Sequence, residues 1–106
     1  MPTYNKLIRD KIPEIITMTG KQAKTTILSN DDYVKELQKK TKEELQEYLT
    51  SANDQEALDE LADLLELIHA LAKIHGSSIE EVEKAREAKA IQRGGFDEKV
   101  FLTEVE

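Results

Sequence analysis

Residues 43–68 read EELQEYLTSANDQEALDELADLLELI, and this stretch decides the fold. Apolar residues recur three or four positions apart on both sides of a short polar link, which is the pattern of two amphipathic helices. Asn53 and Asp54 in the link are typical of a helix start. We therefore predict helices over residues 30–49 and about 54–75, and the short link favours antiparallel packing between them.

Four acidic residues in these two predicted helices lie on faces that otherwise carry apolar side chains. Successive residues turn by about 100° around a helix axis, which places Glu44 and Glu47 in the apolar arc of the first helix. The same reasoning places Glu60 and Asp63 among the leucines of the second helix. Each pair has a spacing of three, so its two side chains share a face, and antiparallel packing makes the pairs face each other.

Carboxylates gathered in a partly buried seam repel one another, and each costs several kcal/mol to desolvate unless it is compensated. A divalent cation offsets both penalties, and a ligand set made only of oxygen suits Mg²⁺ best and Mn²⁺ second. We predict that the metal ligands are Glu44, Glu47, Glu60 and Asp63. The competing interpretation is that these acids pair with lysines or lie at a helix edge.

Two further helices flank the central pair in this interpretation. Leu7–Thr19 reads as a short helix with Pro13 in its first turn. The other begins after Ser77 or Ser78, with Glu81 at capping-box distance from Ser78, and ends at Gly94-Gly95.

The remaining segments allow one small β element. Thr and Ile give residues 21–28 strand character, and the tail DEKVFLTEV, residues 97–105, alternates weakly. We expect residues 23–28 to pair with this tail. The predicted fold is then an all-α helical bundle with antiparallel central helices, one short two-stranded β element, and a single domain over residues 1–106.

Charge is unevenly distributed along the chain, whose formal net charge is −7. The balance is +3 in residues 1–24 and −10 in residues 25–106, which excludes a nucleic-acid polymer as a partner and requires a cation between the protein and any phosphate substrate. Cysteine is absent, and neither a signal peptide nor a membrane span is apparent. We expect a cytoplasmic protein that does not contact a membrane.

Basic residues near both ends are candidates for binding phosphate. Lys89 and Arg93 lie four apart on the apolar arc of the last helix, so they can hold one triphosphate together, the arginine in bidentate fashion. The alternative is a salt bridge to another helix or side chains that reach past apolar surface to water. Lys6 and Arg9 belong to the basic N-terminal patch and are further substrate-binding candidates, although Arg9 and Asp10 fit structural ion pairs equally well.

These motifs resemble the MazG-like all-α nucleoside triphosphate pyrophosphatase superfamily. Its signature is E-x-x-E on one helix and E-x-x-D on the next, here Glu44-Leu-Gln-Glu47 and Glu60-Leu-Ala-Asp63. The opening YNKLIRDKIPEII is similar to a subgroup of predicted house-cleaning enzymes, often labelled phosphoribosyl-ATP pyrophosphohydrolase-like. The closing K-x-x-x-R-G-G-F, Lys89 to Phe96, is similar to members of the superfamily.

The resemblance implies a Mg²⁺-dependent enzyme that hydrolyses a nucleoside triphosphate, non-standard or damaged ones included, to a monophosphate and pyrophosphate. It also implies a homodimer or homotetramer in which the four acids bind the metal. Glu43 and Glu47 border the metal-facing stripe, so each is a candidate general base. One alternative is the phosphoribosyl-ATP pyrophosphohydrolase of histidine biosynthesis, and another is a non-catalytic acidic helical module that binds other proteins.

Overall fold

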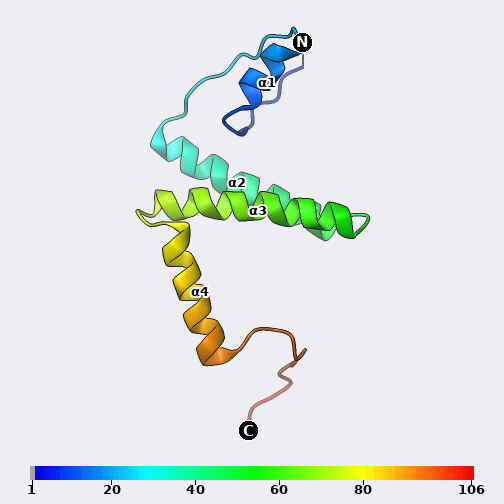
Figure 1. Ribbon diagram of the computed structural model, residues 1–106, viewed down its shortest axis with the longest axis vertical. Coiled ribbons are helices and arrows are strands. Elements are labelled where there is room, and N and C mark those ends of the chain that lie inside the picture. The colour runs from blue at the N-terminus through cyan, green and yellow to red at the C-terminus, as the bar shows by residue number, and fades with distance from the viewer. Residues whose placement is uncertain (1) are drawn as a thin grey trace.

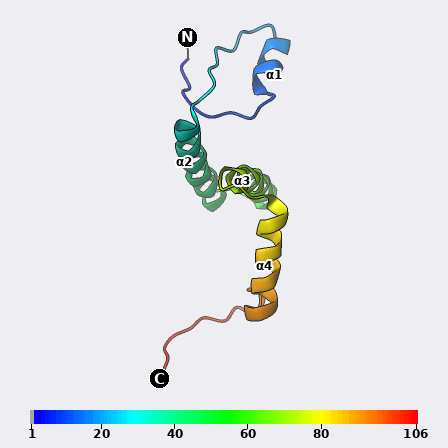
Figure 2. The ribbon, with the colours of Figure 1, turned by 90° about the vertical axis from the view of Figure 1, so that its left-hand side faces the viewer.

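The computed structural model describes residues 2–106. Its helices are α1 (Ile12–Met18), α2 (Asn30–Leu49), α3 (Asp54–Ile74) and α4 (Ile79–Arg93). Helices α2 and α3 lie side by side and antiparallel, while α1 and α4 lie on opposite sides of this pair (Figures 1 and 2). The predicted all-α fold with antiparallel central helices is confirmed. Across the described range, no helix combines the length and the apolar character that a membrane span requires.

Each long helix is preceded by an N-cap residue whose side chain accepts a hydrogen bond from a backbone N–H of the first turn. The N–H groups of the first turn have no partner within the helix, so the cap stabilises the helix start. The predicted starts of α3 and α4 are confirmed, and α2 begins at Asn30 as expected but with the preceding Ser29 as its cap. The three caps are Ser29, Asn53 and Ser78, which accept from the N–H groups of Asp32, Glu56 and Glu81.

Helix α1 is shorter than the predicted Leu7–Thr19. It begins at Ile12, with Pro13 in its first turn, and its C-terminal cap is Thr19. A helix that began at Leu7 would place Pro13 in its interior, where the ring clashes with the carbonyl four residues earlier and the N–H is missing. Residues 2–9 are therefore non-helical, and they reach α2 and α3 as an irregular segment.

Within residues 2–106 there is no strand, so the predicted pairing of residues 23–28 with residues 97–105 is wrong. The two segments lie toward opposite ends of the molecule because α4 carries the tail away from the α2–α3 pair (Figure 1). An isolated segment has no neighbour for its backbone N–H and C=O groups. Residue types that favour strands are therefore not sufficient to form a β element without a neighbouring segment to pair with.

The buried core is small and lies along the seam between α2 and α3. Among residues 2–106, the buried apolar residues are Leu37, which is 2% exposed, Leu67 and Ala72, and the charged Glu44 is buried as well. The radius of gyration is 18.1 Å, whereas a compact domain of this length has about 13 Å. The chain by itself thus leaves many large apolar side chains exposed.

Replacing Leu37 with Ala should destabilise the protein by about 2–4 kcal/mol, because it leaves a cavity at the seam. Urea denaturation followed by circular dichroism at 222 nm measures the effect. The control is Ile27→Ala, at a side chain that is 95% exposed. Equal stability of the two variants would show that the α2–α3 seam is not the core.

Candidate metal centre

Three carboxylates converge on the α2–α3 seam. Glu44 and Glu47 come from α2, one helical turn apart, and Glu60 comes from the antiparallel α3. One oxygen atom from each of these side chains lies within 4.8 Å of the other two. Glu44 is 8% exposed, Glu60 is half-buried and Glu47 is exposed, so the cluster opens to solvent on one side. The structure therefore brings together three of the four acids that the helical spacing selected.

The surroundings of this acid cluster (Glu44, Glu47 and Glu60) oppose negative charge. Burial, the largest cause, and the nearby carboxyl groups of Glu60, Glu47 and Asp63 together raise the pKa of Glu44 from 4.5 to about 8. Two buried oxygen atoms, Glu44 Oε2 and Glu60 Oε2, have no hydrogen-bond partner. Leaving buried polar atoms unpartnered is costly, so the cluster is suited to a ligand that carries positive charge.

A divalent cation fits these residues. The donor atoms are all carboxylate oxygens, and hard cations such as Mg²⁺ and Mn²⁺ prefer such donors. A cation between α2 and α3 would contact the two unpartnered oxygens and offset the repulsion that raises the Glu44 pKa. The competing interpretation is that these acids pair with lysines or lie at a helix edge. Within residues 2–106 no salt bridge involves Glu44, Glu47 or Glu60, while the exposed position of Glu47 fits a helix edge.

Asp63, the fourth predicted ligand, lies at the edge of the cluster. It follows Glu60 by one helical turn, and its charge is close enough to affect the pKa of Glu44. Its carboxylate is not part of the group of three that converges. Instead, Asp63 Oδ1 accepts a hydrogen bond of 2.6 Å from Arg9 Nη2. Arg9 is thus in an ion pair, as one of the two interpretations of the N-terminal patch expected, although its partner is Asp63.

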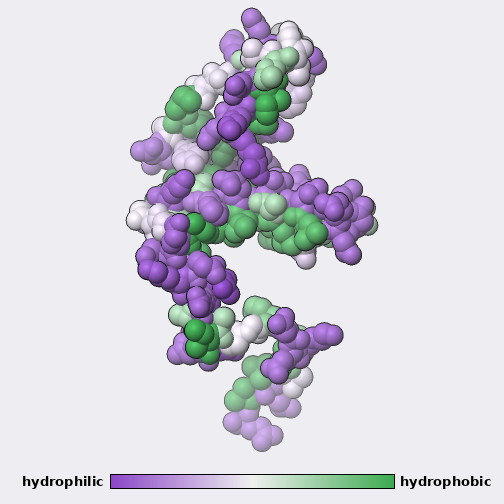
Figure 3. Space-filling view, in the orientation of Figure 1, coloured by the Kyte–Doolittle hydropathy of each residue, from purple (hydrophilic) through white to green (hydrophobic). Residues whose placement is uncertain are grey.

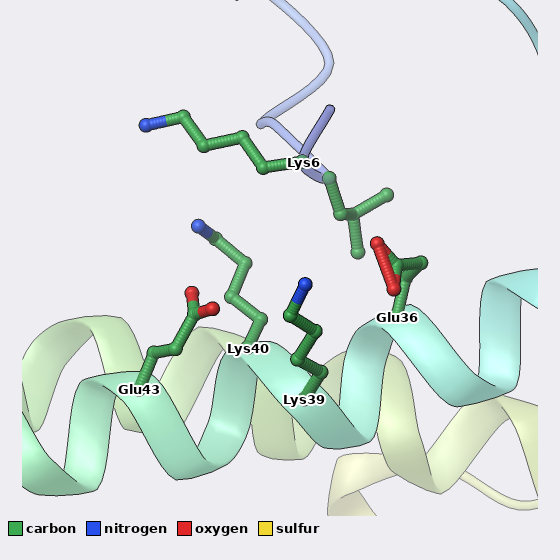
Figure 4. A pocket seen from close by; sticks show the side chains of 6 residues that line it. Lys6, Glu36, Lys39, Lys40 and Glu43 are labelled. Atoms are coloured by element: carbon green, nitrogen blue, oxygen red, sulfur yellow. The ribbon is translucent and has the colours of Figure 1, made fainter. Parts of the chain in front are cut away.

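Beside the cluster, the N-terminal segment crosses α2 and forms a shallow notch. Lys6 and Leu7 line it from the segment, and α2 contributes Glu36, Lys39, Lys40 and Glu43. The amino groups of Lys6 and Lys40 extend toward the same side of α2 as the Glu43 carboxylate (Figure 4). Three lysines therefore lie next to an acid that immediately precedes Glu44.

Sequence reasoning selected Lys6 and Glu43 but missed Lys39 and Lys40. Their signal was available, because they precede Glu43 by four and three residues and therefore share its helix face. On a helix rich in charged residues most lysines only face water, so this spacing alone does not single out these two.

The cationic residues of α4 have a different position. Helix α4 starts at the C-terminal end of α3 and extends away from the α2–α3 pair in both views (Figures 1 and 2). Lys89 and Arg93 occupy the last turns of this helix, so one subunit does not bring them to the acid cluster. Arg86 pairs with Glu83 within the same helix. The role of Lys89 and Arg93 in substrate binding stays a prediction.

Glu44 should make the metal-free protein less stable as the pH rises from about 4.5 to about 8. At lower pH the folded and unfolded states both hold the proton, and within this window only the unfolded state releases it, so folding becomes less favourable. Glu44→Gln removes this titration. In EDTA, the Tm of the variant relative to the wild type should rise between about pH 5 and about pH 8, as measured by thermal circular dichroism. A constant difference would contradict the burial of a protonated Glu44.

Comparison with known proteins agrees with the acid motifs. A family model described as phosphoribosyl-ATP pyrophosphohydrolase matches residues 3–90, which include the acid cluster, Asp63 and the N-terminal segment. No curated protein and no solved structure gives a significant match. Because the match covers most of the sequence, the chain belongs to the phosphoribosyl-ATP pyrophosphohydrolase family, a group of nucleotide pyrophosphohydrolases within the MazG-like all-α superfamily.

Proposed function

We propose that this chain is a Mg²⁺-dependent nucleoside triphosphate pyrophosphohydrolase that releases a nucleoside monophosphate and pyrophosphate. Membership of the family supports the reaction class. The observation that carries the proposal is the pair of buried carboxylate oxygens, one on Glu44 and one on Glu60, that lack hydrogen-bond partners. Bound Mg²⁺ supplies charge neutralisation for the phosphates and lowers the pKa of a bound water.

In this proposal Mg²⁺ is held by Glu44, Glu47, Glu60 and Asp63. The buried Glu44 and the half-buried Glu60 would hold the ion in the seam, and the exposed Glu47 lies where the cluster opens to solvent. Two carboxylates are candidates for the base that accepts a proton from the attacking water, namely Glu43 and Glu47. Glu43 lies outside the group of three, so accepting a proton would not compete with holding the metal there.

Positive side chains are needed to bind a triphosphate to a chain whose net charge is −7. Lys6 fulfils this role in our proposal together with Arg9, and the position of Lys40 beside Lys6 adds it to the set (Figure 4). Lys89 and Arg93 would contact the phosphates of a site on another subunit, since their own helix leads away from the cluster of the same subunit.

The family description favours a second candidate substrate, phosphoribosyl-ATP, which is cleaved by the same chemistry. Cleavage between the α- and β-phosphates makes the same demands on the metal and the lysines, so the acid cluster does not separate the two. A substrate panel does, if it contains natural nucleoside triphosphates, oxidised or otherwise non-standard ones, and phosphoribosyl-ATP. The highest kcat/KM identifies the substrate class.

Glu44→Gln and Glu60→Gln should lower the rate of pyrophosphate release by about two orders of magnitude or more, because an amide weakens metal binding in the seam. The helices should persist by circular dichroism. Glu66→Gln, on the solvated face of α3, is the control. Release of orthophosphate in place of pyrophosphate would contradict the proposed reaction, and full activity of Glu44→Gln would remove that residue from the site.

The same assay separates the two candidate bases. If the replaced glutamate is the general base, Glu→Gln should abolish turnover and leave the affinity for Mn²⁺ unchanged. If it is a metal ligand, both turnover and the affinity for Mn²⁺ should fall. We expect the first result for Glu43 and the second for Glu47. Loss of Mn²⁺ affinity in Glu43→Gln would exclude the assignment of Glu43 as the base.

We also propose that the functional unit is a homodimer or homotetramer. A stripe of four large apolar side chains runs along α3 at helical spacing, with exposed fractions between 39% and 61%. Figure 3 shows hydrophobic surface along the side of α3 that faces the space beside α4. Exposure on this scale is typical of a face that another chain covers. The stripe consists of Leu58, Leu61, Leu65 and Ile68.

Leu65→Lys should shift the protein toward monomers, because it places a charge within this stripe. Sedimentation velocity over a concentration series measures the shift. Glu66→Lys introduces the same side chain one position later, on the solvated face, and should leave the assembly unchanged. A wild-type protein that is monomeric at high concentration would contradict the proposed assembly.

A further inference from the structure

The contact between Arg9 and Asp63 is unlike the other side-chain hydrogen bonds of the molecule. It joins residues 54 positions apart. Within residues 2–106, every other hydrogen bond that involves a side chain joins residues three or four positions apart. Arg9 therefore ties the N-terminal segment to α3, and it does so at the edge of the acid cluster.

The ion pair also affects the predicted set of metal ligands. Asp63 shares a helix face with Glu60, so an aspartate here is suited to complete the ligand set. Its Oδ1 is instead occupied by the guanidinium group of Arg9 at 2.6 Å. Arg9 thus pairs with Asp63, the one predicted ligand whose carboxylate does not converge with those of the other three.

The Arg9–Asp63 ion pair is exposed to solvent, so a cation can reach Asp63 and displace Arg9. The Arg9 and Asp63 side chains are 55% and 39% exposed. Exposed ion pairs are weak, because water screens both charges and two side chains must be held in one geometry. A divalent cation in the acid cluster has a higher charge than a guanidinium group and contacts carboxylate oxygens directly.

We propose that Arg9 is a displaceable counter-ion of Asp63. In the metal-free chain its guanidinium group neutralises Asp63 and holds the N-terminal segment against α3. A divalent cation that recruits Asp63 as a ligand displaces Arg9 and releases the segment from α3, which frees the guanidinium group to contact the substrate phosphates. In the metal-free chain Arg9 is thus a positioning residue that acts through Asp63. The inference rests on the proposed metal site, and it predicts that removing Arg9 strengthens metal binding.

Titration of the full-length, metal-free protein with Mn²⁺ at low ionic strength, followed by isothermal calorimetry, tests this inference. Arg9→Ala should lower the Kd for Mn²⁺ about two- to fivefold, which matches the strength of an exposed ion pair. Lys11→Ala removes a positive charge from the same segment without removing the Asp63 contact, so its effect should be smaller. In an Asp63→Asn background, Arg9→Ala should have no effect.

Hydrogen exchange of residues 6–11 gives an independent readout. Mn²⁺ should increase exchange in the wild type, and Arg9→Ala should exchange at the higher rate without metal. An unchanged or higher Kd in Arg9→Ala, or slower exchange with Mn²⁺, overturns the inference. If either result is found although the wild type binds Mn²⁺ and releases pyrophosphate, the displacement of Arg9 is wrong and the proposed function stands. If no variant binds Mn²⁺ and no pyrophosphate appears, the proposed function fails with it.

Discussion

The repulsion among carboxylates at the α2–α3 seam is the constraint on which the rest of the structure depends. A buried glutamate lowers stability unless a proton or a cation neutralises it, and here burial and neighbouring acids raise the pKa of Glu44 to about 8. An apolar residue at this position would avoid the penalty. In the function proposed above, the buried glutamate at this position lowers stability in exchange for a cation-binding site.

Acidic and basic side chains around the seam come from different segments of the chain. Helices α2 and α3 carry the acid cluster that we propose as the metal site, and the N-terminal segment places Lys6 beside α2 and Arg9 against Asp63 of α3. The irregular path of this segment follows from Pro13, which delays the start of α1 and leaves the preceding residues free to cross α2. A local restriction on the backbone thus places basic side chains beside an acidic site.

Helical periodicity was sufficient to predict the central pair of helices and the faces on which their acids lie. Glu44, Glu47 and Glu60 converge because spacing along each helix fixes direction, and the short link fixes the antiparallel order. The ion pair between Arg9 and Asp63 was beyond such reasoning, since its members are 54 residues apart and no periodic pattern relates them. The predicted strand pair failed for the same reason, because strand propensity does not identify a partner.

The central claim is that a divalent cation is bound between α2 and α3. The most direct measurement is an anomalous difference map from crystals grown with Mn²⁺. We expect a peak in the seam, about 2 Å from oxygen atoms of Glu44, Glu47 and Glu60. A map from Mn²⁺-saturated crystals without a peak there, or with Mn²⁺ bound only elsewhere on the surface, would contradict it.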